Sequence, residues 1–254
     1  MRIYLGFDDT DTEDSDRGTG KLARWFENQL PDDCRMSGVL RQQLLVHEKI
    51  PYTSHNSAAC VVIDAPDASF FDIIIDRASQ HVEHFYLEGS DPGICAAIDG
   101  DSALRELMQF GRECTQNVMT QKDALSAARQ VHLSGHGGTN DGIIGAAAAV
   151  GLTASGWSGR FIERDGLRKI PAIISVKDLN ALGVRVVSLD RDASVPKSED
   201  LVITKNWVRP RLLGWEPVLM VREKGKGTWE NIGGKRQKNK HNTAAVSDLS
   251  RTAL

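Results

Sequence analysis

The sequence has little cysteine, and its four cysteines lie far apart: Cys34, Cys60, Cys95 and Cys114. No C-x-x-C pair occurs, which argues against a zinc ribbon and against a disulfide framework. No run of about 18 apolar residues is present, so no membrane-spanning helix and no membrane partner are expected. The first residues lack the basic and apolar stretches of a secretory signal. Together these absences predict a cytoplasmic protein.

A strong net charge is also missing: the formal charge is -3. Binding to bulk RNA is therefore expected to be weak, because phosphate neutralisation dominates such affinity. Hydrophobic residues make up 41% of the 254 residues and charged residues 26%, which is enough to build a packed core. Two local biases remain. Residues 8–16 are acidic and residues 222–240 are basic, so one segment favours cations and the other favours anions.

The pattern of apolar residues mixes strands and helices without strict β-α-β alternation, which predicts an α+β fold. No Pro/Ser-rich linker and no internal repeat is visible. Strands are expected over residues 1–7, 39–46, 58–63, 94–98, 160–163, 170–174, 184–189, 201–204 and 217–222. Helices are expected over residues 19–30, 67–85, 103–110, 122–131 and 143–150.

The loop after the first expected strand carries three aspartates within four residues, Asp8, Asp9 and Asp11, around Thr10. Carboxylates are hard oxygen ligands, and Mg²⁺ takes one or two of them together with water and phosphate oxygens. A bound cation would also relieve the repulsion among these charges. The sequence therefore predicts a magnesium site here; the alternative is a solvated acidic turn.

A second loop, residues 135–142, is rich in glycine and precedes an apolar helix. Backbone N–H groups in such a loop, here around Gly138, Asn140 and Gly142, can approach an anion, and the helix start adds a positive dipole. The lysine of a Walker A loop is absent. The loop predicts phosphate binding, with an ordinary flexible turn as the alternative. A metal loop plus an anion cradle is the minimum for nucleotide chemistry.

Two other functions stay open. Asp9-Thr10-Asp11-Thr12 after an apolar strand, with Gly138-Thr139-Asn140-Asp141, resembles the nucleophile motif and metal loop of haloacid-dehalogenase-like phosphatases. That metal loop normally has an acidic residue between its two glycines, which is absent here. A non-catalytic nucleotide- or RNA-binding protein is the remaining alternative.

The ordered motifs together resemble one family, the archaeal tRNA-isoleucine 2-agmatinylcytidine synthetases. Its G-[IV]-D-D-T-D-S loop resembles Gly6 to Thr12, and a threonine at the following helix resembles Thr19. Further collinear matches are the segment 50–58, the turn Asp91-Pro92-Gly93, the glycine-alanine helix from Gly142 to Gly151, and Pro217-Val218-Leu219. The matches extend over residues 1–222.

The resemblance implies a kinase-like ATP-binding part combined with a ferredoxin-like part, and an ATP-dependent transfer to an acceptor. By similarity, Asp8, Asp9 and Asp11 would hold Mg²⁺ and ATP. Thr19 would match an autophosphorylated threonine, and Asn56 with Gly142 and Gly145 would line the site. The chain stops before the family's OB-fold and zinc ribbon, so it resembles a stand-alone relative. Residues 1–222 would form the two-part core, and 223–254 a basic Gly/Lys-rich segment and loose tail.

The acceptor stays open among an RNA base, a small amine and a small metabolite. Where the family has K-T-R-G-N, this chain has Tyr52-Thr53-Ser54-His55-Asn56, which lacks Lys and Arg. Lys21 is a candidate phosphate contact, and His55 and His136 flank the presumed site. Weaker candidates are an anion patch of Lys205, Arg209 and Arg211 around Trp207, and base stacking on Trp229.

Overall fold

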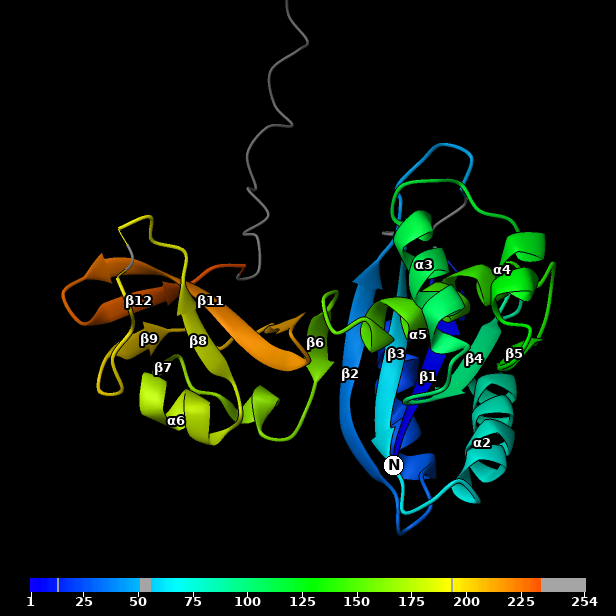
Figure 1. Ribbon diagram of the computed structural model, residues 1–254, viewed down its shortest axis with the longest axis horizontal. Coiled ribbons are helices and arrows are strands. Elements are labelled where there is room, and N and C mark those ends of the chain that lie inside the picture. The colour runs from blue at the N-terminus through cyan, green and yellow to red at the C-terminus, as the bar shows by residue number, and fades with distance from the viewer. Residues whose placement is uncertain (13, 51–55, 193, 234–254) are drawn as a thin grey trace, which may run out of the picture.

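The computed structural model describes residues 1–12, 14–50, 56–192 and 194–233. The described strands form one twelve-stranded mixed sheet in the order β5-β4-β1-β3-β2-β6-β10-β11-β12-β9-β7, and β8 pairs with β11. Figure 1 shows two lobes joined near β6 and β10. Most pairs are antiparallel, and the two parallel pairs are β8 with β11 and β9 with β12. Both belong to the second lobe.

The first lobe is a sheet with helices on both faces (Figure 1). Its strands are β1 (Arg2–Asp8), β2 (Arg35–Gln43), β3 (Ser57–Asp64), β4 (Gly93–Ile98), β5 (His132–Gly135) and β6 (Arg160–Glu163). Its helices are α1 (Thr19–Trp25), α2 (Phe70–Phe85), α3 (Leu104–Cys114), α4 (Gln121–Ala127) and α5 (Gly142–Ala154), and a 3-10 turn, η1 (Phe26–Gln29), follows α1.

Side-chain alternation along β1 explains the two layers. Ile3, Leu5 and Phe7 belong to the core formed with α1 and α2, whereas Tyr4 belongs to the core formed with α3 and α5. Successive strand residues face opposite sides of a sheet, so a strand buried on both faces is apolar throughout. Gly6 sits where α5 crosses β1: a Cβ there would lie 2.3 Å from the Ala146 carbonyl oxygen. The close approach fixes α5, and with it the glycine-rich loop, against the end of β1.

The second lobe is built from short strands around two longer hairpins. Its strands are β7 (Ile173–Ser175), β8 (Arg185–Ser188), β9 (Leu201–Ile203), β10 (Arg211–Leu213), β11 (Glu216–Gly225) and β12 (Thr228–Asn231). It also contains α6 (Val176–Ala181) and the 3-10 turn η2 (Leu167–Lys169). Helices and strands thus form a mixed α/β architecture, and β5, β10 and β12 were not expected from the sequence.

The expected boundary at residue 222 falls inside β11, because β11 continues to Gly225 and pairs with β12. Trp229 on β12 is only 3% exposed, and its indole N–H donates to the Asp200 carboxylate at 2.9 Å. Base stacking on Trp229 is therefore wrong, since the ring is a core residue of the second lobe. The loose tail expected over 243–254 lies outside the described residues. Within the part of the chain that is described, no helix is long and apolar enough to cross a membrane.

Candidate active site

The acidic loop begins where β1 ends, and its last aspartate anchors the first helix. The Asp11 carboxylate accepts from the Thr19 backbone N–H at 2.9 Å and from the Thr19 hydroxyl at 3.1 Å. The Thr10 hydroxyl lies 3.2 Å from the Thr19 hydroxyl, and both threonines are buried. Asp11 therefore stabilises the N-terminus of α1, as an acidic group does at a helix start. This network holds the loop in place from the side of α1.

Asp8 is the most enclosed carboxylate of the loop, and α5 leaves room for it only through a glycine. A Cβ at Gly145 would lie 1.7 Å from Asp8 Oδ2. Burial, the neighbouring charge of Asp9 and the charge of Asp11 raise the pKa of Asp8 to about 8, while a hydrogen bond with the Asp9 backbone lowers it. Desolvation is the dominant cause, because a buried carboxyl loses the hydration of its charged form. In the absence of a cation Asp8 therefore keeps its proton near neutral pH.

Asp9 turns the chain in the left-handed region, with φ of 51°, and faces two acidic residues from distant segments. Burial, then the charges of Asp91 and Asp11, raise its pKa to about 6, with a further contribution from Asp141; a hydrogen bond with the Asp91 backbone opposes them. Asp91 follows α2 and Asp141 precedes α5. The sequence analysis gave neither a part in the acidic cluster; the only signals were the Asp-Pro-Gly turn and an acidic residue at a helix start.

A cavity of about 300 Å³ opens beside these carboxylates. It is lined by Asp8, Asp9, Leu44, Lys49, Ile50, Asn56, Cys114, Asn117, Val118, Met119, Thr120, Gln121, Asp141, Gly142, Ile144 and Gly145. The wall is polar on the side of β1 and α5 and mostly apolar on the side of the chain after α3. Lys49, which the sequence analysis did not consider, is the one Lys or Arg among the described lining residues.

The glycine-rich loop holds an anion, but that anion is a side chain of this protein. Thr139 donates its backbone N–H to Asp91 Oδ1 and its hydroxyl to Asp91 Oδ2, each at 2.7 Å. Gly138 has φ of 56°, and a Cβ there would lie 1.6 Å from Asp91 Oδ1. The prediction that the N–H groups around Gly138 face a bound phosphate is therefore wrong for the described loop, because Asp91 already occupies that place.

Gly142 also differs from its expected role. Its backbone N–H donates to the Asp91 carbonyl oxygen at 2.9 Å, and a Cβ there would lie 2.3 Å from that same oxygen. The glycine is needed for close packing of α5 on the turn before β4. Its N–H is therefore not directed at a ligand, although Gly142 does line the cavity.

The remaining expected residues divide between the cavity and its surroundings. Asn56 lines the cavity, and its side-chain amide donates to the Leu45 carbonyl at 2.7 Å. Thr10, Thr19, Lys21, Gly138 and Asn140 are not among the lining residues. Lys21 lies over the Trp25 ring, 5.1 Å from its centroid, because both residues are on α1. His136 directly follows β5, with Nε2 2.9 Å from the Ser134 hydroxyl. His55 lies outside the described residues.

The donor set fits a divalent cation only in part. Among the described residues, no group of three or more His, Cys, Asp or Glu side chains is arranged to hold a metal ion. Asp8 and Asp9 nevertheless supply two carboxylates from adjacent positions, both of which repulsion and burial disfavour as free anions. Mg²⁺ commonly takes no more than one or two protein carboxylates, and phosphates and water complete its shell. The residues therefore fit a magnesium ion that arrives with a phosphate ligand.

Comparison with known proteins finds likeness at the level of structure only. No family model and no curated protein matches the chain. Two solved structures that match are a tRNA fluorescent labeling enzyme and TiaS in complex with an isoleucine tRNA and ATP. Each is 25% identical with a TM-score of 0.51, and each match covers 59% of this chain and 36% of the other. The chain thus spans about a third of these proteins, and over the matched part its fold is TiaS-like, as the sequence resemblance led us to expect.

Proposed function

We propose that this protein binds ATP with magnesium in the cavity beside Asp8 and Asp9 and uses it to activate an acceptor. The observation that carries the proposal is the pair of buried carboxylates, Asp8 and Asp9, at the floor of a cavity that also receives Lys49. The solved TiaS complex with tRNA and ATP supports the nucleotide, since that protein shares the fold. The division into kinase-like and ferredoxin-like parts belongs to this proposal.

In this account each residue of the chain has a separate task. Asp8 and Asp9 hold the cation, and Gly145 leaves the space in which Asp8 can do so. Asp11, Thr10 and Thr19 position the loop through their hydrogen bonds at the start of α1. Lys49 contacts a phosphate oxygen, and Asn56 shapes the opposite wall. Bound magnesium would neutralise phosphate charge and orient the group to be transferred.

The acceptor would be an RNA base, a small amine or a small metabolite. TiaS acts as a guide to the first two, because its solved complexes contain tRNA and, in another case, agmatine. The apolar wall formed by Val118, Met119 and Ile144 gives the cavity a surface on which an uncharged part of a ligand can pack. Activation by either phosphoryl or nucleotidyl transfer is compatible with this geometry.

Incubation with ATP and analysis of the nucleotide products tests the proposal. We expect magnesium-dependent formation of AMP or ADP when RNA or an amine is supplied. Asp8→Asn and Asp9→Asn should each reduce turnover at least ~100-fold, since both remove a ligand charge at the reacting phosphates. Asp32→Asn, which changes an exposed carboxylate in the turn before β2, should leave turnover unchanged.

The same experiment separates the alternatives. A nucleotide- or RNA-binding protein without catalysis would bind ATP and produce neither AMP nor ADP with any acceptor. A haloacid-dehalogenase-like phosphatase would hydrolyse a phosphomonoester without ATP and would lose that activity in Asp9→Asn.

A further inference from the structure

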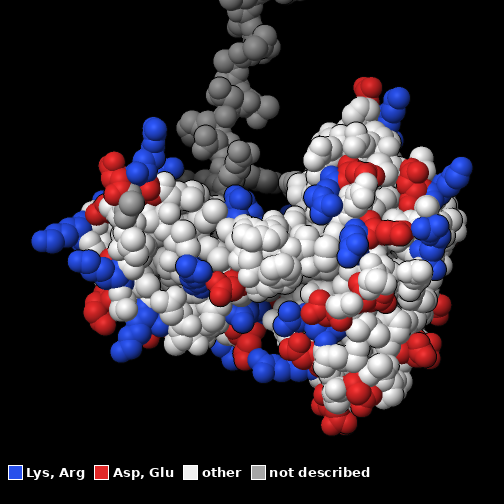
Figure 2. Space-filling model, in the orientation of Figure 1, with Lys and Arg blue, Asp and Glu red and all other residues white. Residues whose placement is uncertain are grey.

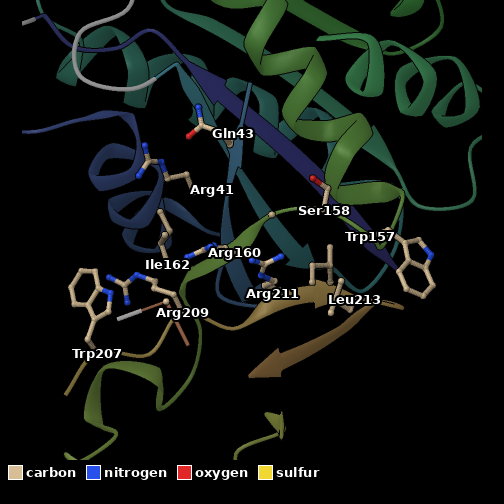
Figure 3. Close-up of a pocket in the computed structure, with 13 residues that line it drawn as sticks. Arg41, Gln43, Trp157, Ser158, Arg160, Ile162, Trp207, Arg209, Arg211 and Leu213 are labelled. Carbon is tan, nitrogen blue, oxygen red and sulfur yellow. The ribbon is translucent and has the colours of Figure 1, made fainter. Parts of the chain in front are cut away.

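A second cavity, of about 520 Å³, lies where the two lobes meet, and four arginines line it. Arg41 comes from β2, Arg160 from β6 and Arg211 from β10, and Arg209 precedes β10 (Figure 3). We call this cavity the arginine groove. Its other described lining residues are Gln43, Trp157, Ser158, Gly159, Ile162, Trp207, Leu212, Leu213 and Gly233, and none of them is acidic.

Three of these arginines form a row across neighbouring strands. Arg160 is the direct cross-strand partner of Arg41 on one side and of Arg211 on the other. Like charges directly opposite one another destabilise a sheet, because their Cβ atoms lie about 5 Å apart. Such a row is unfavourable for folding alone, and an anion bound along it would remove the repulsion.

Within the described chain, the protein's own carboxylates do not neutralise the row. The carboxylate that acts on the groove's arginines is Glu163, which raises the pKa of Arg209 and is already paired with Arg168 and Arg24. The pKa of Arg41 is lowered first by burial and then by Arg160, and that of Arg160 first by burial and then by Arg211. Elsewhere on the face shown in Figure 2, acidic and basic side chains are interspersed.

An aromatic surface accompanies the charges. The Arg209 guanidinium stacks on the Trp207 ring, 3.9 Å from its centroid, and Trp157 at the other end of the groove is 64% exposed. Planar guanidinium and indole groups are the surfaces on which nucleic-acid bases stack. Arginine in turn presents a fork of donors that matches phosphate oxygens. The anion patch suggested by the sequence around Trp207 thus contains Arg209 and Arg211; Lys205 pairs instead with Glu230 at 2.6 Å.

The groove adjoins the acidic cavity along one strand. Gln43 lines the groove, and the next residue, Leu44, lines the cavity. The Gln43 amide also donates to the carbonyl of Asn56, which lines the cavity. A chain of phosphates lying along the groove would therefore have one end close to the place where ATP is proposed to bind.

We propose that the arginine groove binds successive phosphate groups of a single-stranded oligonucleotide, with a base stacked beside Trp207 and Arg209. Charge, shape and the aromatic surface favour this ligand over a bare polyanion, which would use the arginines alone. Binding in the groove is separate from ATP binding, because the two sets of lining residues do not overlap. The groove identifies the partner that would bring an RNA acceptor to the proposed active site, and to that extent it rests on the proposed function.

Fluorescence anisotropy of the full-length protein with a labelled single-stranded RNA of about 10 nucleotides, without ATP, tests the groove. The double variant Arg160→Ala/Arg211→Ala should weaken binding ~10- to 100-fold. It should also reduce the salt slope of log K by about 1.4, because each single-strand phosphate contact contributes about 0.7. Lys224→Ala/Lys226→Ala removes two exposed charges from β11 and the β11–β12 turn and should change binding less than about threefold. Melting curves of both variants check that they fold.

Competition experiments identify the ligand. Trp207→Ala should weaken RNA binding about tenfold, and Trp207→Phe should restore most of it, since stacking on an aromatic ring tolerates the exchange. Inorganic polyphosphate or polyglutamate that competes as well as RNA at equal charge would overturn the proposal. An equal loss of RNA binding in the lysine variant would do the same, because it would place the affinity on the general surface. Loss of ATP turnover with intact RNA binding would contradict the proposed function and leave the groove in place.

Discussion

The acidic cavity and the arginine groove each gather charges of one sign, yet they relieve the resulting repulsion in different ways. Asp8 and Asp9 can take up protons, and burial with mutual repulsion raises their pKa values to about 8 and about 6. The arginines cannot release theirs in the physiological range: even Arg209, where burial and then Arg168 and Arg24 lower the pKa, stays near 10. The cavity can therefore exist without its ligand by protonation, whereas the groove keeps its charge and requires an anion or solvent.

This difference separates how the two sites should respond to substitution, to pH and to ligands. The cavity depends on close packing around a buried acid, so changes there affect the fold. The row in the groove lies on the surface of strands, so changes there affect binding and only slightly the fold.

The largest effect is expected where the cavity depends on glycine. In Gly145→Ala the new Cβ would overlap Asp8 Oδ2, so either α5 shifts or Asp8 leaves its position. We expect a loss of about 1–3 kcal/mol in the free energy of unfolding, as overpacking usually costs, together with loss of ATP binding. Denaturant titration measures the first. Gly225→Ala is the matched control, since a Cβ there meets nothing within 4 Å. Equal stability of the two variants would contradict the packing described for Asp8.

The next effect concerns pH in the absence of metal. The pKa of Asp8 rises from 3.8 to about 8 on folding, chiefly through burial. The folded state therefore binds more protons than the unfolded state between these values, and stability must fall as pH rises from about 4 to about 8. Asp8→Asn carries no such charge, so its melting temperature should decline less over this interval. Parallel melting curves for parent and variant in EDTA would contradict the burial of Asp8.

The smallest effect is expected in the groove and has the opposite sign. Removing the middle charge of the row in Arg160→Thr should stabilise the ligand-free protein by about 0.2–1 kcal/mol, the range for cross-strand pairs. Arg185→Thr on β8 is the comparison, because Arg185 is paired with Glu216 at 3.2 Å and its loss should be neutral or slightly destabilising. Thermal unfolding of both variants at low salt measures the difference. Destabilisation by Arg160→Thr would show that the row is balanced by a partner within the protein.

The parts of the structure that follow local rules were predictable. The apolar periodicity from Phe70 to Val82 matches α2, and the strand before Asp8 is β1. Short strands with little apolar character were not, such as β5, whose only large apolar residue is Leu133, and β12, where Trp229 is buried by pairing with distant strands. Their stability comes from tertiary pairing, which outweighs local propensity.

The candidate sites show the same division. A run of aspartates after a strand indicated the cavity, but Asp91 and Asp141 join it only through the packing of α5 against β4. The glycine-rich loop indicated an anion correctly and its identity wrongly, because Asp91 lies 48 positions from its partner Thr139. Arg41, Arg160 and Arg211 belong to no motif in the sequence, and only the order β2-β6-β10 brings them into one row.

Equilibrium binding of ATP with and without magnesium tests the central claim most directly. If Asp8 and Asp9 hold a cation that arrives with the nucleotide, the parent protein should bind ATP at least ~10-fold more tightly in about 10 mM Mg²⁺ than in EDTA, by linkage of the two ligands. Asp8→Asn should lose this magnesium dependence, and Asp32→Asn should keep it. The same ATP affinity in EDTA and in magnesium, or an unchanged magnesium dependence in Asp8→Asn, would contradict the account.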